Sequence, residues 1–283
     1  MASAPAPAPA VVRTDNASPP DADADASGAG LVVLAGAAAA MVVWQGTGWV
    51  LRTRLGFHTS RLWNRVVHGT DFTFHAISGA GVAPLTLAWT DSAGLVQHTE
   101  LSDTRRTPLV LSGIPSCAKH LEDVLAALPP RTAHARAGGA PLVVLHTLNE
   151  PWECVEAGLD LLLVPSQALA VQSHLYPTPD GCAPAYADLL RAVRNLDSRD
   201  EDGACACVVH CKAGRGRSAV VVAAYLGHLA YGAGARPSAR ELETALVSRR
   251  PQVELSRAQR GVLQRFLDEL YRVGDLHSMP PGA

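Results

Sequence analysis

From about residue 107 onward, short apolar runs alternate with longer segments in which apolar residues recur every three or four positions. The short runs are typical of buried strands, and they lie at residues 109–111, 142–145, 159–164 and 205–209. Helical spacing occurs at residues 117–128, 184–196 and 218–229, and capping boxes at Ser238 and Ser256 predict two further helices. This alternation predicts an α/β fold with a central, mostly parallel sheet flanked by helices.

The first hundred residues follow a different pattern. Residues 1–30 alternate Ala with Pro and then become acidic, without apolar periodicity, which is typical of a disordered tail. Residues 31–51 carry no charge and are followed by several arginines, so residues 31–65 are expected to associate with a membrane. An alanine-rich helix that packs on the folded domain is the alternative.

The remaining boundaries follow from the same pattern. Residues 66–106 form a variable segment without an assigned function, in which residues 85–89 and 95–98 predict a hairpin around residues 91–94. The α/β domain is expected to span residues 107–274, and residues 275–283 are expected to form a tail.

Composition narrows the class of protein. Hydrophobic residues make up 48% of the chain and charged residues 18%, which is ample material for a packed core. A formal net charge of −2 argues against a nucleic-acid partner. The six cysteines include no C-x-x-C pair, so we expect a reducing compartment, no metal site and no cofactor.

The strongest chemical signal lies at residues 208–218, with the sequence Val-Val-His-Cys-Lys-Ala-Gly-Arg-Gly-Arg-Ser. A buried strand leads into a glycine-bearing loop and then a helix, and backbone N–H groups at such a helix start form an anion cradle. Cys211 begins the loop, where positive potential lowers cysteine pKa values to roughly 3.5–7.5. We therefore predict Cys211 as a thiolate nucleophile that attacks phosphorus.

The residues around Cys211 have matching predicted roles. The fork of Arg217 binds two oxygens of a phosphoryl group, and Ser218 donates a hydrogen bond to the sulfur. His210 is expected to orient the loop. The predicted phosphate-binding residues are Lys212, Ala213, Gly214, Arg215, Gly216 and Arg217. A buried structural cysteine beside an incidental loop is the alternative interpretation.

A phosphate ester also needs a proton donor for its leaving oxygen, and an aspartate on a loop upstream is expected. Asp180 lies in a Pro-Thr-Pro-Asp-Gly loop before a helix and is the predicted general acid, although a turn-forming role is the alternative. The other candidates lie in a strand pattern, in a helix pattern or in a charged surface turn; they are Asp160, Asp188, Asp197, Asp200 and Asp202.

The loop at residues 210–218 resembles the signature loop of the protein-tyrosine and dual-specificity phosphatases. Residues 147–153 (Thr-Leu-Asn-Glu-Pro-Trp-Glu) resemble the glutamate-bearing loop of the mitochondrial and plant dual-specificity-like phosphatases that act on phosphatidylglycerophosphate. Further segments similar to that family are residues 61–67, 110–115, 212–218, 249–253 and 256–259.

This resemblance implies a cysteine-phosphatase fold and conversion of phosphatidylglycerophosphate to phosphatidylglycerol through a phosphocysteine. It also implies an anionic phospholipid substrate, a membrane surface, and a location at the mitochondrial inner membrane or in a plastid, although the acidic N-terminal tail is atypical of a targeting signal. Glu150 and Glu153 either shape the pocket and hold Arg217 or are solvated loop carboxylates.

Other functions stay open at this point. Lys212 and Arg215 add positive charge at the pocket rim, which suits phosphatidylglycerophosphate, a phosphoinositide or a phosphoprotein loop alike. A phosphoinositide phosphatase and a dual-specificity protein phosphatase are therefore the alternatives. A catalytically inactive phosphate-binding module is a fourth hypothesis, which the presence of both Cys211 and Arg217 disfavours. No protein partner is predicted.

Overall fold

The computed structural model describes residue 58 and residues 72–128, 141–159, 169–200 and 204–281. The chain divides into two compact units, residues 1–59 and residues 60–283, and the helices and strands below belong to the second. The predicted tail at residues 1–30 and the predicted membrane-associated stretch at residues 31–51 lie outside the described residues. Among the residues that are described, no helix is both long enough and apolar enough to cross a membrane.

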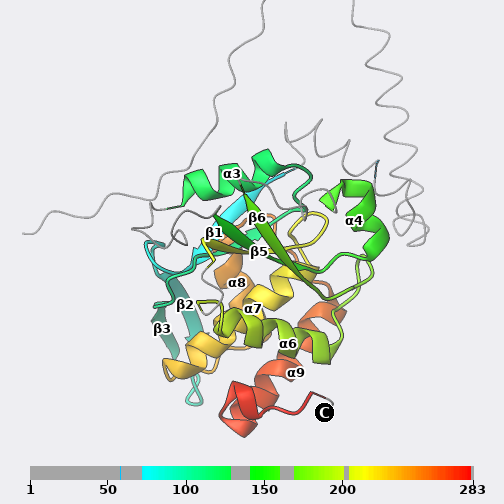
Figure 1. The fold of residues 1–283 in the computed structure, drawn as a ribbon. Helices are drawn as coiled ribbons and strands as arrows, with labels where there is room; N and C mark the ends of the chain where they lie inside the picture. The colour runs from blue at the N-terminus through cyan, green and yellow to red at the C-terminus, as the bar shows by residue number, and fades with distance from the viewer. Residues whose placement is uncertain (1–57, 59–71, 129–140, 160–168, 201–203, 282–283) are drawn as a thin grey trace, which may run out of the picture. The chain divides into compact units, whose positions relative to one another are not determined.

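A five-stranded sheet forms the centre of the second unit (Figure 1). Its strands, in spatial order, are β1 (Phe74–Ser78), β4 (Leu109–Ser112), β7 (Ala206–His210), β5 (Leu142–Thr147) and β6 (Ala170–Leu175). The last four run parallel, and β1 pairs antiparallel with β4 at one edge. The predicted α/β fold with a mostly parallel sheet is confirmed.

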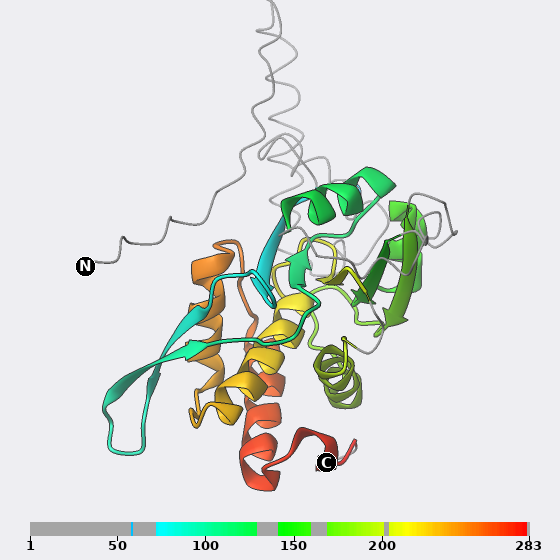
Figure 2. The same cartoon turned by 60° about the vertical axis from the view of Figure 1, so that its left-hand side comes forward.

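Helices cover both faces of this sheet. The helices α6 (Tyr186–Asp197), α7 (Arg217–Gly232), α8 (Ala239–Arg249) and α9 (Arg257–Val273) pack on one face, and α3 (Ala118–Ala127) and α4 (Pro151–Ala157) pack on the other. Figure 2 shows α3 above the strands of the sheet, and α7 and α9 below them. Side chains alternate accordingly along the strands: Leu111 and Val209 enter the larger core, whereas Val110 and Val208 enter the core under α3.

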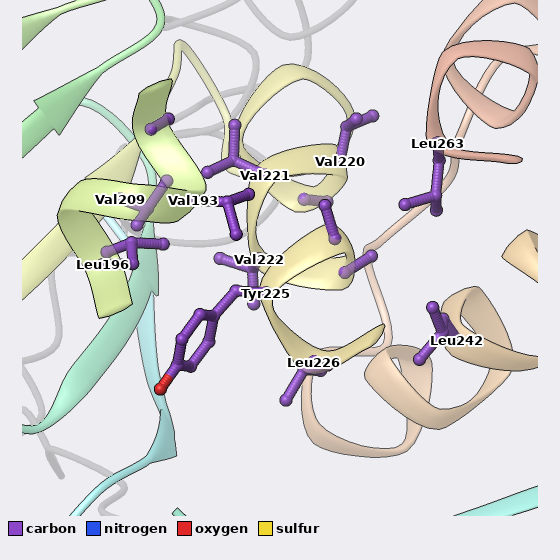
Figure 3. Close-up of a cluster of buried hydrophobic side chains, with 14 of the residues drawn as sticks. Val193, Leu196, Val209, Val220, Val221, Val222, Tyr225, Leu226, Leu242 and Leu263 are labelled. Carbon is purple, nitrogen blue, oxygen red and sulfur yellow. The ribbon is translucent and has the colours of Figure 1, made fainter. Parts of the chain in front are cut away.

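Helix α7 is buried on nearly all sides. Its residues from Arg217 to Gly227 are buried, because the sheet, α6, α8 and α9 surround it. Figure 3 shows Val221 and Val222 towards α6 and β7, with Leu242 and Leu263 across from the other side of the helix. A helix that is apolar around its circumference is typical of such a central position. The packing fixes the start of α7 near the carboxyl end of β7. The loop at residues 210–218, called the signature loop below, lies at this point.

Two domain boundaries differ from the sequence-based expectation. β1 belongs to the sheet, with Ile77 buried in the larger core, so the domain starts well before residue 107. Residues 275–281, expected as a tail, are also anchored: Leu276 is buried and Arg194 donates hydrogen bonds to three carbonyls there. Both segments are short, and neither contains a long apolar run, so a search for apolar runs did not find them.

The strand predicted at residues 159–164 lies, beyond Leu159, outside the described residues. The strand that pairs with β5 is β6, which the sequence pattern did not predict. β6 lies at the edge of the sheet, and its side chains are partly exposed. It can therefore contain polar residues, which are Gln172, Ser173 and His174. Its polar composition explains why the pattern missed it.

The predicted hairpin and the two predicted capping boxes are confirmed. β2 (Leu85–Thr90) and β3 (Val96–Leu101) form the expected antiparallel hairpin, whose turn is closed by hydrogen bonds to Asp91. Both capping boxes are present, with Ser238 paired to Glu241 and Ser256 paired to Gln259.

The role of β1 in the core can be tested at the glycine that follows it. Gly79 has φ of +113°, and a Cβ there would lie 2.8 Å from the Cα of Pro108. Gly79→Ala is expected to lower the free energy of unfolding by about 2–4 kcal/mol in urea titrations, from strain plus steric overlap. The matched control is Gly94→Ala, which has φ of +79° but open space around it, and should cost about 1–2 kcal/mol. Equal losses in the two variants would contradict close packing of β1 on Pro108.

Candidate active site

The signature loop lies between β7, which ends at His210, and α7, which begins at Arg217. In sheets of this type, ligands bind at the carboxyl ends of the strands. The loop is tied to neighbouring strand ends, because Leu148 N–H donates to the carbonyl of His210 at 3.0 Å and Ile114 N–H donates to that of Lys212 at 3.3 Å. The backbone of the loop is therefore fixed before any ligand arrives.

Gly214 is required by this close packing. Its φ is +68°, and a Cβ at this position would lie 2.5 Å from the carbonyl oxygen of Ser112. Both the backbone conformation and the contact exclude a larger residue. The loop thus wraps against the end of β4.

Cys211 is 3% exposed at the start of the loop. The hydroxyl of Ser218 donates a hydrogen bond to its sulfur at 3.2 Å, as predicted from the sequence. Burial raises the pKa of the Cys211 thiol, but the charge of Arg217 and the hydrogen bonds from Ser218 outweigh burial and hold that pKa below its usual value. The arrangement favours a thiolate.

Arg217 is buried beside it and makes a two-point ion pair with Glu153. Nη1 lies 2.6 Å from Oε2, and Nη2 lies 3.0 Å from Oε1. Nη1 also donates to the carbonyl of Thr178 at 2.8 Å. Glu153 and the negative charge of Cys211 raise the pKa of Arg217 although burial opposes this, so the guanidinium stays charged. Such fork geometry fixes the plane of the guanidinium.

Glu153 therefore lies inside the protein and is not a solvated loop carboxylate. It is 1% exposed and sits in the first turn of α4, where it also accepts a hydrogen bond from the backbone N–H of Glu150 at 2.9 Å. The side chain of Glu150 is only half-buried, and its hydrogen bonds do not include Arg217. Of the two predicted glutamates, the structure brings only Glu153 to the guanidinium.

Asp180 reaches Arg217 from the loop after β6. Its Oδ1 lies 3.1 Å from Nη2 of Arg217, and its Oδ2 lies 3.4 Å from Nζ of Lys212. Its side chain is 26% exposed, so the carboxylate contacts Arg217 and Lys212 and still reaches solvent.

The other candidate aspartates lie elsewhere or outside the described residues. Asp188 pairs with Arg191 on the surface of α6. Asp197 pairs with Arg105, and Asp200 accepts from the backbone of Arg106 and Thr107. Asp160 and Asp202 lie outside the described part of the chain.

His210 is fully buried and neutral. Burial, followed by the charge of Arg217, lowers its pKa to about 3. Its Nε2 lies 2.9 Å from the hydroxyl of Thr147 on β5, which places the ring as a brace between two strands. The remaining residues of the loop differ in exposure: Arg215 is exposed, Ala213 and Gly216 are partly exposed, and Lys212 is buried.

Sequence reasoning missed two contributors. The carbonyl of Thr178 fixes Arg217, but a backbone contact leaves no signal in the sequence. Gln259 was identified only as part of a capping box. Its amide also donates to the carbonyl of Cys182 at 2.9 Å, and a Cβ at Gly216 would lie 2.8 Å from its Oε1. Gln259 thus joins the signature loop to the segment that follows Asp180.

Part of the chain matches a known protein family. Residues 156–262 match a family described as PTP-SAK, Swiss Army Knife protein, DSP-PTPase phosphatase domain. That match contains Asp180, Cys211 and Arg217, whereas Glu153 lies just before it. A search of curated proteins found no match.

Similar solved structures include three phosphatases. PTPMT1 in complex with PI(5)P is 22% identical over 59% of this chain and 94% of its own, with a TM-score of 0.37. Tk-PTP in its active form is 24% identical over 56% and 91%, with a TM-score of 0.39. Kinase-associated phosphatase is 17% identical over 68% and 98%, with a TM-score of 0.45.

The pairing of Arg217 with Glu153 gives a test of the site. Glu153→Gln keeps the shape of the side chain but removes the negative charge, which leaves a buried guanidinium without its main anionic partner. We expect kcat/KM for an aryl phosphate to fall by about 10²-fold, in line with roughly 3 kcal/mol for breaking a buried pair. Glu150→Gln in the same loop is the matched control and should stay within about threefold of wild type. Similar losses in both variants would mean that charge in the loop, and not the fork contact, matters.

Proposed function

We propose that this chain, a cysteine-dependent phosphomonoesterase with a dual-specificity-type phosphatase domain, hydrolyses the terminal phosphate of phosphatidylglycerophosphate to give phosphatidylglycerol. The observation that carries the proposal is the set of contacts that joins Asp180, Arg217 and Glu153. Through Glu153, these contacts link Arg217 and Asp180 to the loop at residues 149–153. The sequence of that loop resembles the glutamate-bearing loop of the phosphatases that act on phosphatidylglycerophosphate.

In the first step, the thiolate of Cys211 attacks phosphorus and the bond to the ester oxygen breaks. Asp180, as the carboxylic acid, transfers its proton to the departing alcohol oxygen. Arg217 holds two phosphoryl oxygens, since its position is fixed by Glu153 and the carbonyl of Thr178. The product is a phosphocysteine and a free alcohol.

In the second step, water attacks the phosphorus of the phosphocysteine. The carboxylate of Asp180 accepts a proton from that water, and the S–P bond breaks to release phosphate. The hydrogen bond from Ser218 to the sulfur stabilises the leaving thiolate. No metal or cofactor enters either step.

The positive charges of Lys212 and Arg215 support a substrate with more than one negative charge. Lys212 lies beside Asp180, and Arg215 projects from the same loop into solvent. The head group of phosphatidylglycerophosphate carries a phosphomonoester and, three carbons away, a phosphodiester. Arg217 and the loop would take the first, and the two basic side chains would attract the second.

Phosphoinositides form the second candidate substrate class, because their head groups also combine a phosphomonoester with a phosphodiester. The same two basic residues favour them. A phosphoprotein substrate needs no second phosphate and receives no specific support from the rim. The proposed site of action is the mitochondrial inner membrane or a plastid membrane, which follows from the proposed substrate.

A substrate panel tests the proposal directly. The full chain would be assayed for phosphate release from phosphatidylglycerophosphate, several phosphoinositides, a phosphotyrosine peptide and an aryl phosphate, each beside Cys211→Ser. We expect kcat/KM to be highest for phosphatidylglycerophosphate, by about tenfold or more, and turnover to vanish in Cys211→Ser while phosphate binding persists. Preference for a phosphoinositide or the peptide would reassign the substrate. Turnover by Cys211→Ser would refute the nucleophile.

The general acid is tested by the leaving group. Asp180→Ala should reduce kcat for the lipid by about 10²-fold or more, because a poor alkoxide leaving group needs the proton. An activated aryl phosphate should lose far less. Asp188→Ala, whose carboxylate pairs with Arg191 on the surface, is the matched control and should match wild type. Equal losses for both classes of substrate would exclude the acid role of Asp180.

A further inference from the structure

A second arginine, Arg250, lies behind the signature loop. It is the residue that directly follows α8, and its side chain is 0% exposed. Its Nε donates to the carbonyl of Gly214 at 2.9 Å and its Nη2 to that of Ala213 at 3.0 Å. Two consecutive loop carbonyls are thus held by one guanidinium.

This contact determines where the N–H groups of the loop point. In a planar trans peptide the C=O and the N–H point in opposite directions. When the carbonyls of Ala213 and Gly214 point to Arg250, the N–H groups of Gly214 and Arg215 must point to the other side of the loop. That orientation is the one an anion cradle needs.

The remaining donors of Arg250 anchor it to the start of the sheet. Nη2 also donates to the hydroxyl of Thr73 at 2.8 Å, and Nη1 lies 2.9 Å from Nδ1 of His75. Because a guanidinium only donates, Nδ1 of His75 must accept, and burial together with Arg250 lowers the pKa of His75 to about 4. β1 therefore supports the signature loop through Arg250.

The charge of Arg250 is not matched by a carboxylate. Its partners in the part of the chain that the structure describes are two carbonyls, a hydroxyl and a neutral imidazole. Burial lowers its pKa to about 10, while the negative charge of Cys211 acts in the opposite direction. A buried cation without an acidic partner is unfavourable unless an anion lies nearby. The thiolate, and a bound phosphate, supply that anion.

We propose that Arg250 is a positioning residue of the phosphate-binding loop, which holds the N–H groups of Gly214 and Arg215 towards the phosphate and adds a second buried positive charge behind Cys211. The inference rests on the proposed function, since it assigns phosphate binding to the same loop. It separates two tasks: Arg217 binds the phosphoryl group from within the pocket, and Arg250 orders the loop from outside.

The test compares three variants of the full chain. Arg250→Met removes both charge and hydrogen bonds, and Arg250→Lys keeps the charge but cannot reproduce the fork. Arg249→Met is the matched control, because Arg249 donates to the carbonyls of Ala83 and Pro84 and makes no contact with the loop. Circular dichroism and thermal melts establish that each variant is folded.

The first readout is the pH dependence of alkylation of Cys211 by iodoacetamide, followed by mass spectrometry of its peptide. The groups that act on this thiol are Arg217 and Ser218 on α7, Asp180 on its loop and Arg250 behind the loop, and His210 is neutral. Arg250→Met should raise the alkylation midpoint by about one pH unit. Arg250→Lys and Arg249→Met should leave it near that of wild type.

The second readout is inhibition by orthovanadate, which occupies the phosphate site. Its affinity should fall by about tenfold or more in Arg250→Met and in Arg250→Lys, because both lose the fork that orders the loop, and should be unchanged in Arg249→Met. The inference would be overturned if Arg250→Met folds and both its alkylation midpoint and its affinity for vanadate equal those of wild type. If Arg250→Met does not fold, Arg250→Lys decides: vanadate affinity within about twofold of wild type overturns the positioning role.

Both readouts are independent of substrate identity. Turnover that persists in Cys211→Ser would refute the proposed function. Unchanged Arg250 variants, with turnover still lost in Cys211→Ser, would refute only the role of Arg250.

Discussion

Burying a positively charged guanidinium is costly unless hydrogen bonds and nearby negative charge compensate it, and the position of Arg217 supplies both. Glu153 holds it from α4, Asp180 contacts it from the loop after β6, and Cys211 faces it from the end of β7. These groups come from distant parts of the sequence. The fold brings them together because β5, β6 and β7 are parallel and their carboxyl ends lie along one edge of the sheet.

The same charge determines the chemistry. Burial alone would keep the thiol of Cys211 protonated, and Arg217 with Ser218 reverses that preference. A phosphate dianion adds negative charge at the place where Asp180 now pairs with Arg217 and Lys212. In the proposed mechanism, Asp180 leaves these ion pairs when the phosphate binds and then serves the leaving oxygen. The proposed mechanism therefore depends on the same charges that hold Arg217 in place.

The sequence predicted the fold class correctly, and it named Asp180, Glu153 and Ser218, which the structure brings to Arg217 and Cys211, because these depend on local signals. The apolar runs of β4, β5 and β7, the capping boxes at Ser238 and Ser256, and the signature loop are each contained in a few consecutive residues. β6 was missed because its side chains are polar and partly exposed, as is common in an edge strand, and β1 was missed because polar residues interrupt its five-residue length. The contacts of Thr178 and Arg250 with the site were missed for another reason. They depend on backbone carbonyls, whose positions follow from the folded chain and not from residue types.

The central claim is that Cys211 carries the phosphoryl group between the two steps. The most direct measurement is rapid acid quenching of Asp180→Ala during turnover of an activated aryl phosphate, with mass spectrometry of the resulting peptides. The account predicts one phosphoryl group on the peptide that contains Cys211, and none in the variant that also carries Cys211→Ser. Burst release of the aryl alcohol without phosphate on that peptide, or phosphate on another residue, would contradict it.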